Sequence, residues 1–473
     1  STNVQIKPFK KVLVAKRGEI AIRVFRALNE LGIQTVSIFS KEDKYALFHS
    51  KADESYPLNP DKGPIDAYLD IPTIIKIAKD HNIDAIHPGY GFLAENPVLV
   101  EECEKNGLVF IGPTVESMNA MGDKISSKQI AIASEVPIIP GVDPHETTEE
   151  AIEVARKVGY PVMLKASNGG GGRGMRIVNS EEEMAKEFKE AIDESKKAFG
   201  DDQVFIEKYL KGPKHVEVQV LADNYGNVVH LFDRDCSVQR RHQKVVEYRP
   251  RLLRAPGARQ KIFDSAIRLC KTVGYRNAGT CEFLVDRDGN PYFIEMNPRI
   301  QVEHTVTELV TDVDIVRSQI LIAEGYPLNS PEINISSQEA IQASYAIQTR
   351  VTSEDPSNNF MPDTGKVSVY HSGSGNGIRL DGGNIYTGAE ILPYYDSLLV
   401  KISAFDRTFK GAAVKSLRAL REMRIQGIKT NISFLINVVN NPTFQAGECY
   451  TTFIEETPEL FDLTSGRPRL QDP

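Results

Sequence analysis

The chain has 473 residues, of which 41% are hydrophobic and 25% charged, and its formal net charge is −8 at pH 7. At roughly 100–200 residues per domain, this length predicts about two to four domains. The acidic balance argues against general binding to nucleic acids or anionic membranes, and no apolar run approaches the roughly 20 residues that span a bilayer.

The cysteine pattern indicates a reducing compartment. Five cysteines are widely spaced and form no Cys-X-X-Cys pair: Cys103, Cys236, Cys270, Cys281 and Cys449. An odd set of this kind predicts neither a disulfide scaffold nor a structural zinc site. The first residues show neither a signal-peptide core nor a transit-peptide pattern. We therefore expect a cytoplasmic protein, or a protein of the mitochondrial matrix if the source is eukaryotic and the chain is processed.

The first unit, residues 1–135, alternates strands and helices. Strands are predicted at 11–15, 35–39 and 109–111, with another just before His-Pro-Gly-Tyr-Gly at 87–91, and helices at 19–31 and 71–81. This βαβα order predicts a doubly wound parallel sheet.

The second unit, residues 136–209, is predicted to be a small α/β lid. A strand at 161–165 precedes a glycine run at 168–174, and a charged helix follows at 180–199. Glycine amides can wrap closely around a phosphate, and Lys165 and Arg173 supply matching charge. The run is no Walker A loop, because no Gly-Lys-Ser/Thr closes it. A flexible glycine linker is the alternative.

The third unit, residues 210–461, is predicted to be mixed α+β, and residues 462–473 a tail or linker. Strands are predicted at 216–222, 228–232, 281–285 and 292–295, with helices at 410–423 and 432–439. The last two strands flank Asp-Arg-Asp-Gly-Asn at 286–290, a sequence typical of a hairpin turn.

Residues 294–304 carry the strongest chemical signal. Every odd position is polar in this stretch: Glu295, Asn297, Arg299, Gln301 and Glu303. An extended strand would place this row on one face, because side chains alternate with period two. Such a row could hold a metal ion and an oxyanion and still leave a base. A solvated amphipathic strand is the alternative.

Two further groups of residues suggest nucleotide chemistry. Glu282 and Glu295 lie on the two arms of the predicted hairpin and, with Asn297, offer the hard oxygen ligands that magnesium takes beside phosphates. Surface acids are the alternative. The stretch 235–247 is rich in donors, among them Gln239, His242 and Lys244, which could line an anionic site or lie in solvent.

Six segments, in this order, resemble the biotin carboxylases of the ATP-grasp superfamily. They are R-G-E-I at 17–20, H-P-G-Y-G at 87–91, M-G-D-K at 121–124, G-G-G-G-R-G-M at 169–175, R-D-C-S-V-Q-R-R-H-Q-K at 234–244 and E-M-N-P-R-I-Q-V-E-H at 295–304. The resemblance covers residues 10–461 and implies an ATP-grasp fold with the three units described above. T-S-E-D-P at 352–356, P-D-T-G at 362–365, K-T-N-I at 429–432 and T-T-F-I-E-E-T-P-E-L-F at 451–461 resemble the pyruvate carboxylases in particular.

The resemblance also implies roles for individual residues. ATP would be held by Lys124, Lys165, Gly169, Gly170, Gly171, Gly172, Gly174, Glu207, Lys208, Leu210, His215, Gln239 and His242. Magnesium or manganese would be held by Glu282, Glu295 and Asn297, bicarbonate by Lys244, Arg299, Gln301 and Val302, and biotin by Tyr90, Arg299 and Arg350. Glu303 would deprotonate bicarbonate, which attacks the γ-phosphate to give carboxyphosphate, and Arg350 would stabilise the biotin enolate.

The partners follow from the same resemblance. The chain has no Met-Lys-Met biotin attachment site, so we expect biotin to arrive on a carrier domain or protein. We expect this chain to be the biotin carboxylase module of a longer pyruvate carboxylase with a carboxyltransferase. It would form a homodimer, with a tetramer as the alternative for the full enzyme. The biotin carboxylase subunit of an acyl-CoA carboxylase, another ATP-grasp carboxylate–amine ligase and a nucleotide-binding scaffold without turnover are the alternatives.

Three positions depart from the family pattern. Lys16 stands where the family usually has asparagine, Ala94 where it has serine, and Tyr248-Arg249 where it has Ala-Pro. None of them carries an assigned catalytic role.

Overall fold

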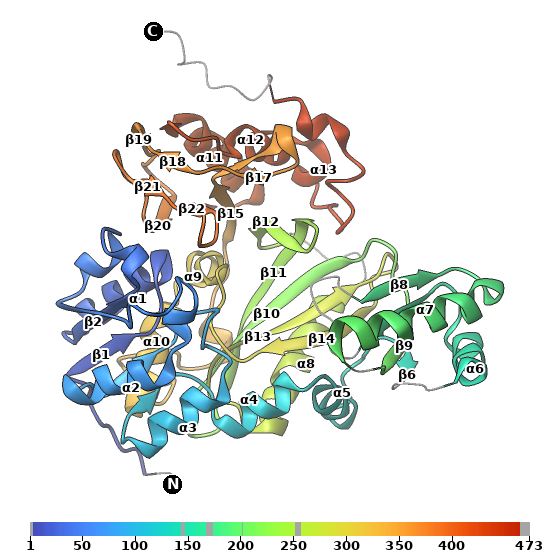
Figure 1. The fold of residues 1–473 in the computed structure, drawn as a ribbon, viewed down its shortest axis with the longest axis horizontal. Coiled ribbons are helices and arrows are strands. Elements are labelled where there is room, and N and C mark those ends of the chain that lie inside the picture. Colours follow the sequence, from blue (N-terminus) through green and yellow to red (C-terminus); the bar gives the residue numbers. More distant parts are fainter. Residues whose placement is uncertain (1–2, 143–146, 167–173, 201, 251–256, 464–473) are drawn as a thin grey trace.

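The computed structural model describes residues 3–142, 147–166, 174–200, 202–250 and 257–463. Three larger β-sheets organise the chain, and each belongs to a different stretch of sequence (Figure 1). The predicted Gly169–Gly172 segment lies outside the described residues.

The N-terminal sheet is parallel and has the order β3-β2-β1-β4-β5. Its strands are β1 (Lys11–Val14), β2 (Gln34–Phe39), β3 (Glu54–Pro57), β4 (Ala85–His87) and β5 (Val109–Phe110), and the helices beside it are α1 (Gly18–Glu30), α2 (Ile71–Asp80) and α3 (Pro97–Lys105). The prediction of a doubly wound sheet is confirmed. The strand order reverses between β1 and β4, and ligands bind at the carboxyl ends of strands at such a point.

A small four-stranded antiparallel sheet with the order β6-β9-β7-β8 follows. Its elements are β6 (Gly141–Val142), α6 (Thr148–Val158), β7 (Val162–Ala166), β8 (Met175–Val178), α7 (Glu181–Phe199) and β9 (Val204–Lys208). The predicted strand and charged helix are confirmed. Apolar side chains of α6 and α7 pack on the strands and form a core of their own.

The central sheet has eight strands in the order β14-β13-β10-β11-β12-β15-β22-β20. They are β10 (Lys214–Ala222), β11 (Val228–Arg240), β12 (Gln243–Tyr248), β13 (Asn277–Val285), β14 (Pro291–Asn297), β15 (Tyr345–Thr352), β20 (Ile378–Gly382) and β22 (Leu398–Asp406). β11 runs eight residues beyond its predicted end at 232. The donor-rich stretch therefore becomes a hairpin, in which Arg241 and His242 turn with φ of 49° and 66°.

The expectation of one extended strand over 294–304 is wrong beyond Asn297. β14 ends there, ahead of Pro298, which lacks the amide hydrogen needed to continue a ladder. Glu303 instead lies at the N-cap position of α9 (His304–Thr311), and its side chain makes no capping hydrogen bond. Ile300, Gln301 and Glu303 are all buried, so the polar and apolar positions no longer alternate between two faces.

Helices cover the central sheet and fill the remaining chain. They are α4 (Val115–Gly122), α5 (Lys124–Ala133), α8 (Ala258–Val273), α10 (Ile315–Glu324), α11 (Phe409–Glu422), α12 (Ile432–Asn440) and α13 (Pro442–Gln445). Short strands complete the C-terminal part: β16 (Glu354–Asp355), β17 (Met361–Pro362), β18 (Gly365–Lys366), β19 (Val369–His371), β21 (Glu390–Ile391) and β23 (Arg424–Gln426). No helix among the described residues has the length and apolarity to cross a membrane. All five cysteines are buried and free.

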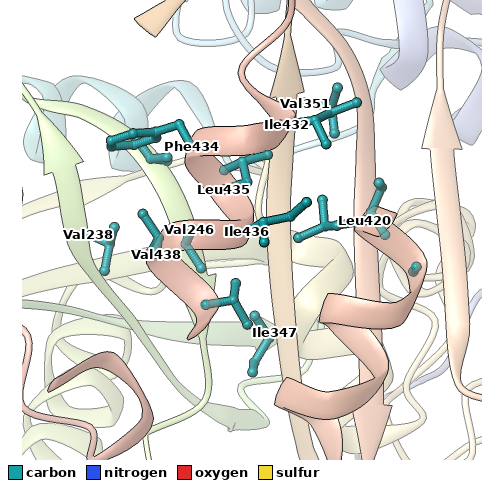
Figure 2. Packing of buried hydrophobic residues seen from close by; sticks show 14 of the residues in the cluster. Val238, Val246, Ile347, Val351, Leu420, Ile432, Phe434, Leu435, Ile436 and Val438 are labelled. Carbon is teal, nitrogen blue, oxygen red and sulfur yellow. The ribbon is translucent and has the colours of Figure 1, made fainter. Parts of the chain in front are cut away.

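Two hydrophobic cores hold the N-terminal unit and the C-terminal helices against the central sheet. One joins Val12 and Ile20 of the N-terminal unit to Leu221 and Ala278 of the central sheet and to Ile320 of α10. The other packs α11 and α12 against β12 and β15 (Figure 2). The N-terminal unit and the central sheet are thus held by continuous apolar packing.

Phe434 tests the second core. Its side chain is fully buried in α12 and packs edge-to-face on Phe360. Phe434→Ala should lower the free energy of unfolding by about 3–5 kcal/mol, because it loses apolar burial and leaves a cavity. Urea unfolding measures this change. Phe405→Ala, at a side chain that is 37% exposed, is the control and should cost much less. Equal losses would contradict the packing described here.

Candidate functional site

Oppositely charged side chains gather where the central strands lie side by side. Their contacts form an unbroken series from Glu247 through Arg350, Glu303, Lys244 and Glu217 to Arg234. These residues come from β10, β11, β12 and β15 and from the start of α9. The sheet brings them together from positions more than a hundred residues apart in sequence.

Lys244 is the central cation of this series. Its ammonium donates to Glu217, to Glu303 Oε1 at 2.7 Å and to Glu282 Oε1 at 3.5 Å. Burial acts to lower the pKa of Lys244, but the carboxylates of Glu217 and Glu303 outweigh it and hold the pKa well above its ordinary value. Lys244 therefore stays charged across the physiological range.

Glu303 lies between two cations. Its Oε1 accepts from Lys244, and its Oε2 accepts from Arg350 Nη2 at 2.9 Å. Burial acts to raise the pKa of this carboxyl, but Lys244, Arg350 and Arg234 together hold it well below the usual range. The side chain is 2% exposed, so the site contains an ionised carboxylate sheltered from water.

Three buried residues of this cluster were missed by sequence reasoning. Glu217 and Arg234 contact each other at 3.0 Å, and Glu247 accepts from Arg350 Nε at 2.6 Å. Burial and the charge of Glu303 raise the pKa of Glu217 to about 8. One signal was available, because Glu217 interrupts the valine-rich strand His-Val-Glu-Val-Gln-Val at a position where an unpaired acid would be costly.

Arg234 positions several neighbours of the cluster at once. Its guanidinium is fully buried and donates to Glu217, Gln219 and Thr307, and also to Gln301 Oε1 at 2.8 Å. Gln301 in turn donates to Glu282 Oε1 at 3.4 Å. Because Gln301 lies in the irregular segment before Glu303, Arg234 ties that segment to the sheet.

Glu282 and Glu295 are paired across β13 and β14, as predicted. Burial raises the pKa of Glu295 to about 8, and so do the hydrogen bond that its protonated carboxyl donates to Glu282 and the negative charge of Glu282. Burial acts to raise the pKa of Glu282, but His215 and Lys244 hold it well below the usual range. Two facing carboxylates suit a divalent cation, which would offset their repulsion. Asn297, buried at the end of β14, is paired with Thr280.

His215 lies beside this pair with a free donor position. Gln239 Nε2 lies 3.1 Å from His215 Nδ1 and donates to it when that nitrogen is unprotonated. His215 Nε2 is buried, lies 3.7 Å from Glu282 Oε2 and has no hydrogen-bond partner among the described residues. A phosphate oxygen would satisfy this donor.

Tyr90 and Arg299 lie at the side of the N-terminal unit. The Tyr90 hydroxyl donates to Glu19, which lies 3.3 Å from Lys401 Nζ. Lys401 is fully buried and donates to the Val302 carbonyl at 2.7 Å. Arg299 lies 3.2 Å from Glu95, and its Nη2 has no acceptor among the described residues.

The other expected nucleotide ligands lie apart from this cluster. Lys165 and Glu207 form an ion pair of 2.9 Å across β7 and β9 of the four-stranded sheet. Lys208 ends β9 and is exposed, and Leu210 follows it; Lys124 begins α5 and is exposed, and His242 is exposed at the β11–β12 turn. Gly174 accepts from the Ala166 amide at 2.9 Å.

Three family models match the chain. They are "Biotin carboxylase, N-terminal domain" over residues 8–118, "Carbamoyl-phosphate synthase L chain, ATP binding domain" over residues 123–331 and "Biotin carboxylase C-terminal domain" over residues 348–456. Together they span all the strands that build the site.

Curated relatives and solved structures agree with these matches. The chain is 55% identical to the pyruvate carboxylase of Staphylococcus aureus over 97% of its length, and 51% identical to the mitochondrial pyruvate carboxylase of Homo sapiens over 99%. It spans 40% of each of these two relatives. The biotin carboxylase domain dimer of Hydrogenobacter thermophilus 2-oxoglutarate carboxylase, solved with MgADP, ADP and bicarbonate, has a TM-score of 0.89 and 46% identity; the match covers 96% of this chain and 99% of that one.

Arg234 tests the buried network. Arg234→Met should lower the free energy of unfolding by about 3–5 kcal/mol, because it leaves Glu217 buried without its guanidinium partner. Arg240→Met, six residues along the same strand and partly exposed, is the matched control and should change stability little. Thermal unfolding of both variants measures the difference. Similar midpoints would show that Glu217 does not depend on Arg234.

Proposed function

The chain belongs to the biotin carboxylase family, and we propose that it uses MgATP and bicarbonate to carboxylate biotin. The observation that carries this proposal is the ionised Glu303 carboxylate, held at 2.7 Å from Lys244 and 2.9 Å from Arg350. A carboxylate kept ready between two cations is suited to remove a proton from an anionic substrate that the same cations attract.

Bicarbonate would bind beside Glu303. Lys244 contacts this carboxylate at 2.7 Å, Gln301 and Val302 precede it in the same segment, and Arg299 still has a free donor. Bicarbonate is a poor nucleophile, and general-base help by a positioned carboxylate typically contributes about 10²–10⁴-fold. Glu303 takes the bicarbonate proton as the oxygen attacks the γ-phosphate, which gives carboxyphosphate and ADP. Lys244 offsets the negative charge that develops there.

ATP and the metal would lie along β13, β14 and the four-stranded unit. Glu282, Glu295 and Asn297 fit magnesium or manganese, which neutralises phosphate charge when bound. His215 and Gln239 face the phosphates in this proposal. Lys124, Lys165, Gly169, Gly170, Gly171, Gly172, Gly174, Glu207, Lys208, Leu210 and His242 complete the ATP site. Several of them lie on the four-stranded unit, which can then close over the nucleotide.

Biotin would enter between Tyr90, Arg299 and Arg350. When bound, its ureido nitrogen would attack the carbon dioxide that carboxyphosphate releases, and the phosphate released with it would take the ureido proton. Arg350 would lower the cost of negative charge on the ureido oxygen, while Tyr90 would form the wall of the pocket. Glu247 fixes the orientation of Arg350 through the Nε hydrogen bond.

The larger enzyme is proposed to be a pyruvate carboxylase. The curated relatives described above carry that name, and this chain matches 40% of their length, which leaves room for carrier and carboxyltransferase domains. A biotin carboxylase subunit of an acyl-CoA carboxylase is the alternative. A dimer of this domain, as in the Hydrogenobacter structure, is part of the proposal, with a tetramer in the full enzyme.

We also propose the division into residues 1–135, 136–209, 210–461 and 462–473, because each of the first three segments contains one of the three larger sheets complete. The compartment is proposed to be reducing, either the cytoplasm or the mitochondrial matrix. All five cysteines are free, and the relatives include bacterial and mitochondrial enzymes.

Phosphate release from MgATP tests the proposed activity. We expect release that requires bicarbonate and increases with free biotin. Glu303→Gln should lower it by about 10²–10⁴-fold while leaving MgATP affinity nearly unchanged, because the amide cannot accept the proton. Glu448→Gln, at an exposed acid, is the control. Release that ignores bicarbonate but requires an amine would support a carboxylate–amine ligase, and nucleotide binding without release would support a scaffold.

A substitution at Arg350 distinguishes the effect on biotin carboxylation from the effect on ATP binding. Arg350→Ala should reduce the stimulation by biotin by about 10²-fold, which is typical for the loss of one charge-stabilising donor, and should affect MgATP affinity far less. Steady-state rates and nucleotide titration measure the two effects. Arg418→Ala, at an exposed ion pair on α11, serves as the control. An equal loss of both properties would make Arg350 a purely structural residue.

A further inference from the structure

Lys16 occupies a position where ligands bind in doubly wound sheets. It follows β1 at its carboxyl end, and Ala15 donates to the His87 carbonyl at the end of β4 at 2.9 Å. The sheet order reverses between these two strands. Lys16 therefore lies directly against the loop that carries Tyr90, the proposed wall of the biotin pocket.

The ammonium of Lys16 contacts aromatic rings instead of a carboxylate. Its Nζ lies 3.4 Å from the centroid of the Phe92 ring and 5.7 Å from that of Tyr90. Among the described residues, no carboxylate lies within ion-pair distance of it, and no acceptor is hydrogen-bonded to it. Cations attract the faces of aromatic rings, and this attraction grows when water is excluded.

The loop is shaped around the lysine side chain. Gly89 and Gly91 have φ of 64° and 69°, in the region that favours glycine. A Cβ on Gly89 would lie 3.0 Å from the Lys16 Cβ and Cγ, and a Cβ on Gly91 would lie 3.3 Å from Nζ. The absence of side chains at both glycines lets the loop close over the lysine and places both rings within its reach.

Burial and the charges around Lys16 bring its pKa close to neutral pH. Arg17 follows it in the chain and Arg299 approaches from the segment after β14, while Glu19 of α1 and Asp396 ahead of β22 supply negative charge. Burial, and then the charge of Arg17, lower the pKa of Lys16 to about 7, although Asp396 acts in the opposite direction. Arg17 is itself neutralised by Asp43 at 2.7 Å.

We propose that Lys16 is a positioning residue of the biotin pocket, whose ammonium holds the rings of Phe92 and Tyr90 and so fixes the pocket wall. This inference rests on the proposed function, because it assigns Tyr90 to biotin. The departure of this chain from asparagine at position 16 then gives it a biotin affinity that depends on the charge of a lysine.

Tyr90 is held from two sides under this proposal. Lys16 contacts its ring, and Glu19 accepts from its hydroxyl. Glu19 also neighbours Lys401, whose hydrogen bond to Val302 connects to the segment that presents Glu303. Loss of the Lys16 charge would release the ring while leaving this second connection intact. The effect should therefore fall on biotin binding and spare bicarbonate-dependent ATP cleavage.

The test compares wild type, Lys16→Met and Lys16→Arg from pH 6 to pH 8.5, with Lys51→Met as an exposed control. The measured quantity is the KM for free biotin in bicarbonate-dependent phosphate release. At pH 6 Lys16→Met should raise this KM roughly tenfold, the range of a desolvated cation–π contact, with little change in the rate without biotin. At this pH Lys16→Arg should match wild type, because both side chains are charged.

The pH dependence distinguishes positioning from a merely structural role. As pH rises through about 7, wild type loses the ammonium. Its KM should therefore rise relative to Lys16→Arg and approach that of Lys16→Met. Comparing ratios at each pH removes the titration of groups common to all variants. A KM ratio between Lys16→Met and wild type that stays constant with pH, or stays at one, overturns the proposal.

Thermal unfolding supplies a readout that does not depend on turnover. A lysine whose folded pKa lies below its unfolded value of 10.5 destabilises the fold when charged, and this penalty disappears as pH rises from about 7 to 10.5. Lys16→Met should therefore unfold at a higher temperature than wild type at pH 6, and the difference should shrink by pH 9. A constant difference would show that Lys16 does not titrate in this range. Absence of bicarbonate-dependent release in wild type would instead refute the proposed function.

Discussion

The structure depends on a complete series of buried ion pairs. Taking carboxylates and cations out of water is expensive, and only mutual contact with good geometry offsets the cost. Here each carboxylate in the series meets a cation: Glu247 meets Arg350, Glu303 meets Arg350 and Lys244, and Glu217 meets Lys244 and Arg234. Glu303 remains ionised because it has two cations, whereas burial, and then repulsion by Glu303, raise the pKa of Glu217. The same arrangement thus stabilises the sheet and divides the roles of two acids.

The central sheet supplies the geometry that these pairs require. Adjacent strands hold their side chains about 5 Å apart in fixed register. Charged side chains on β10, β11 and β12 therefore contact each other directly. Glu303 reaches the series differently, from the irregular segment after β14. Arg234 and Lys401 hold that segment through Gln301 and Val302.

Local patterns in the sequence were enough for β1, β2, β4, β5, α1 and α2 of the N-terminal unit and for the Glu282–Glu295 pair, because hydrophobic period and turn chemistry decide them, whereas β3 and α3 were not predicted. The alternating polar residues at 294–304 led to the wrong prediction of one extended strand. Pro298 ends the strand, and contacts with distant residues bury polar and apolar positions alike. The predicted strand for β11 was too short for a similar reason. Its polar residues are typical of a solvated loop, but in the structure they pair with β10 and β12. Glu217, Arg234 and Glu247 were not predicted as site residues. A charged residue can be assigned to a buried ion pair only when its partner is known, and these partners are distant in sequence. Recognition of the family motifs supplied roles that no single pattern gave.

The apolar core shared by the N-terminal unit and the central sheet has a consequence for engineering. Val12 and Ile20 pack in the same cluster as Leu221, Ala278 and Ile320. The first 110 residues are therefore no detachable module, even though they form a sheet of their own. A chimera that exchanges this unit between relatives would have to transplant the matching faces of β10, β13 and α10 as well.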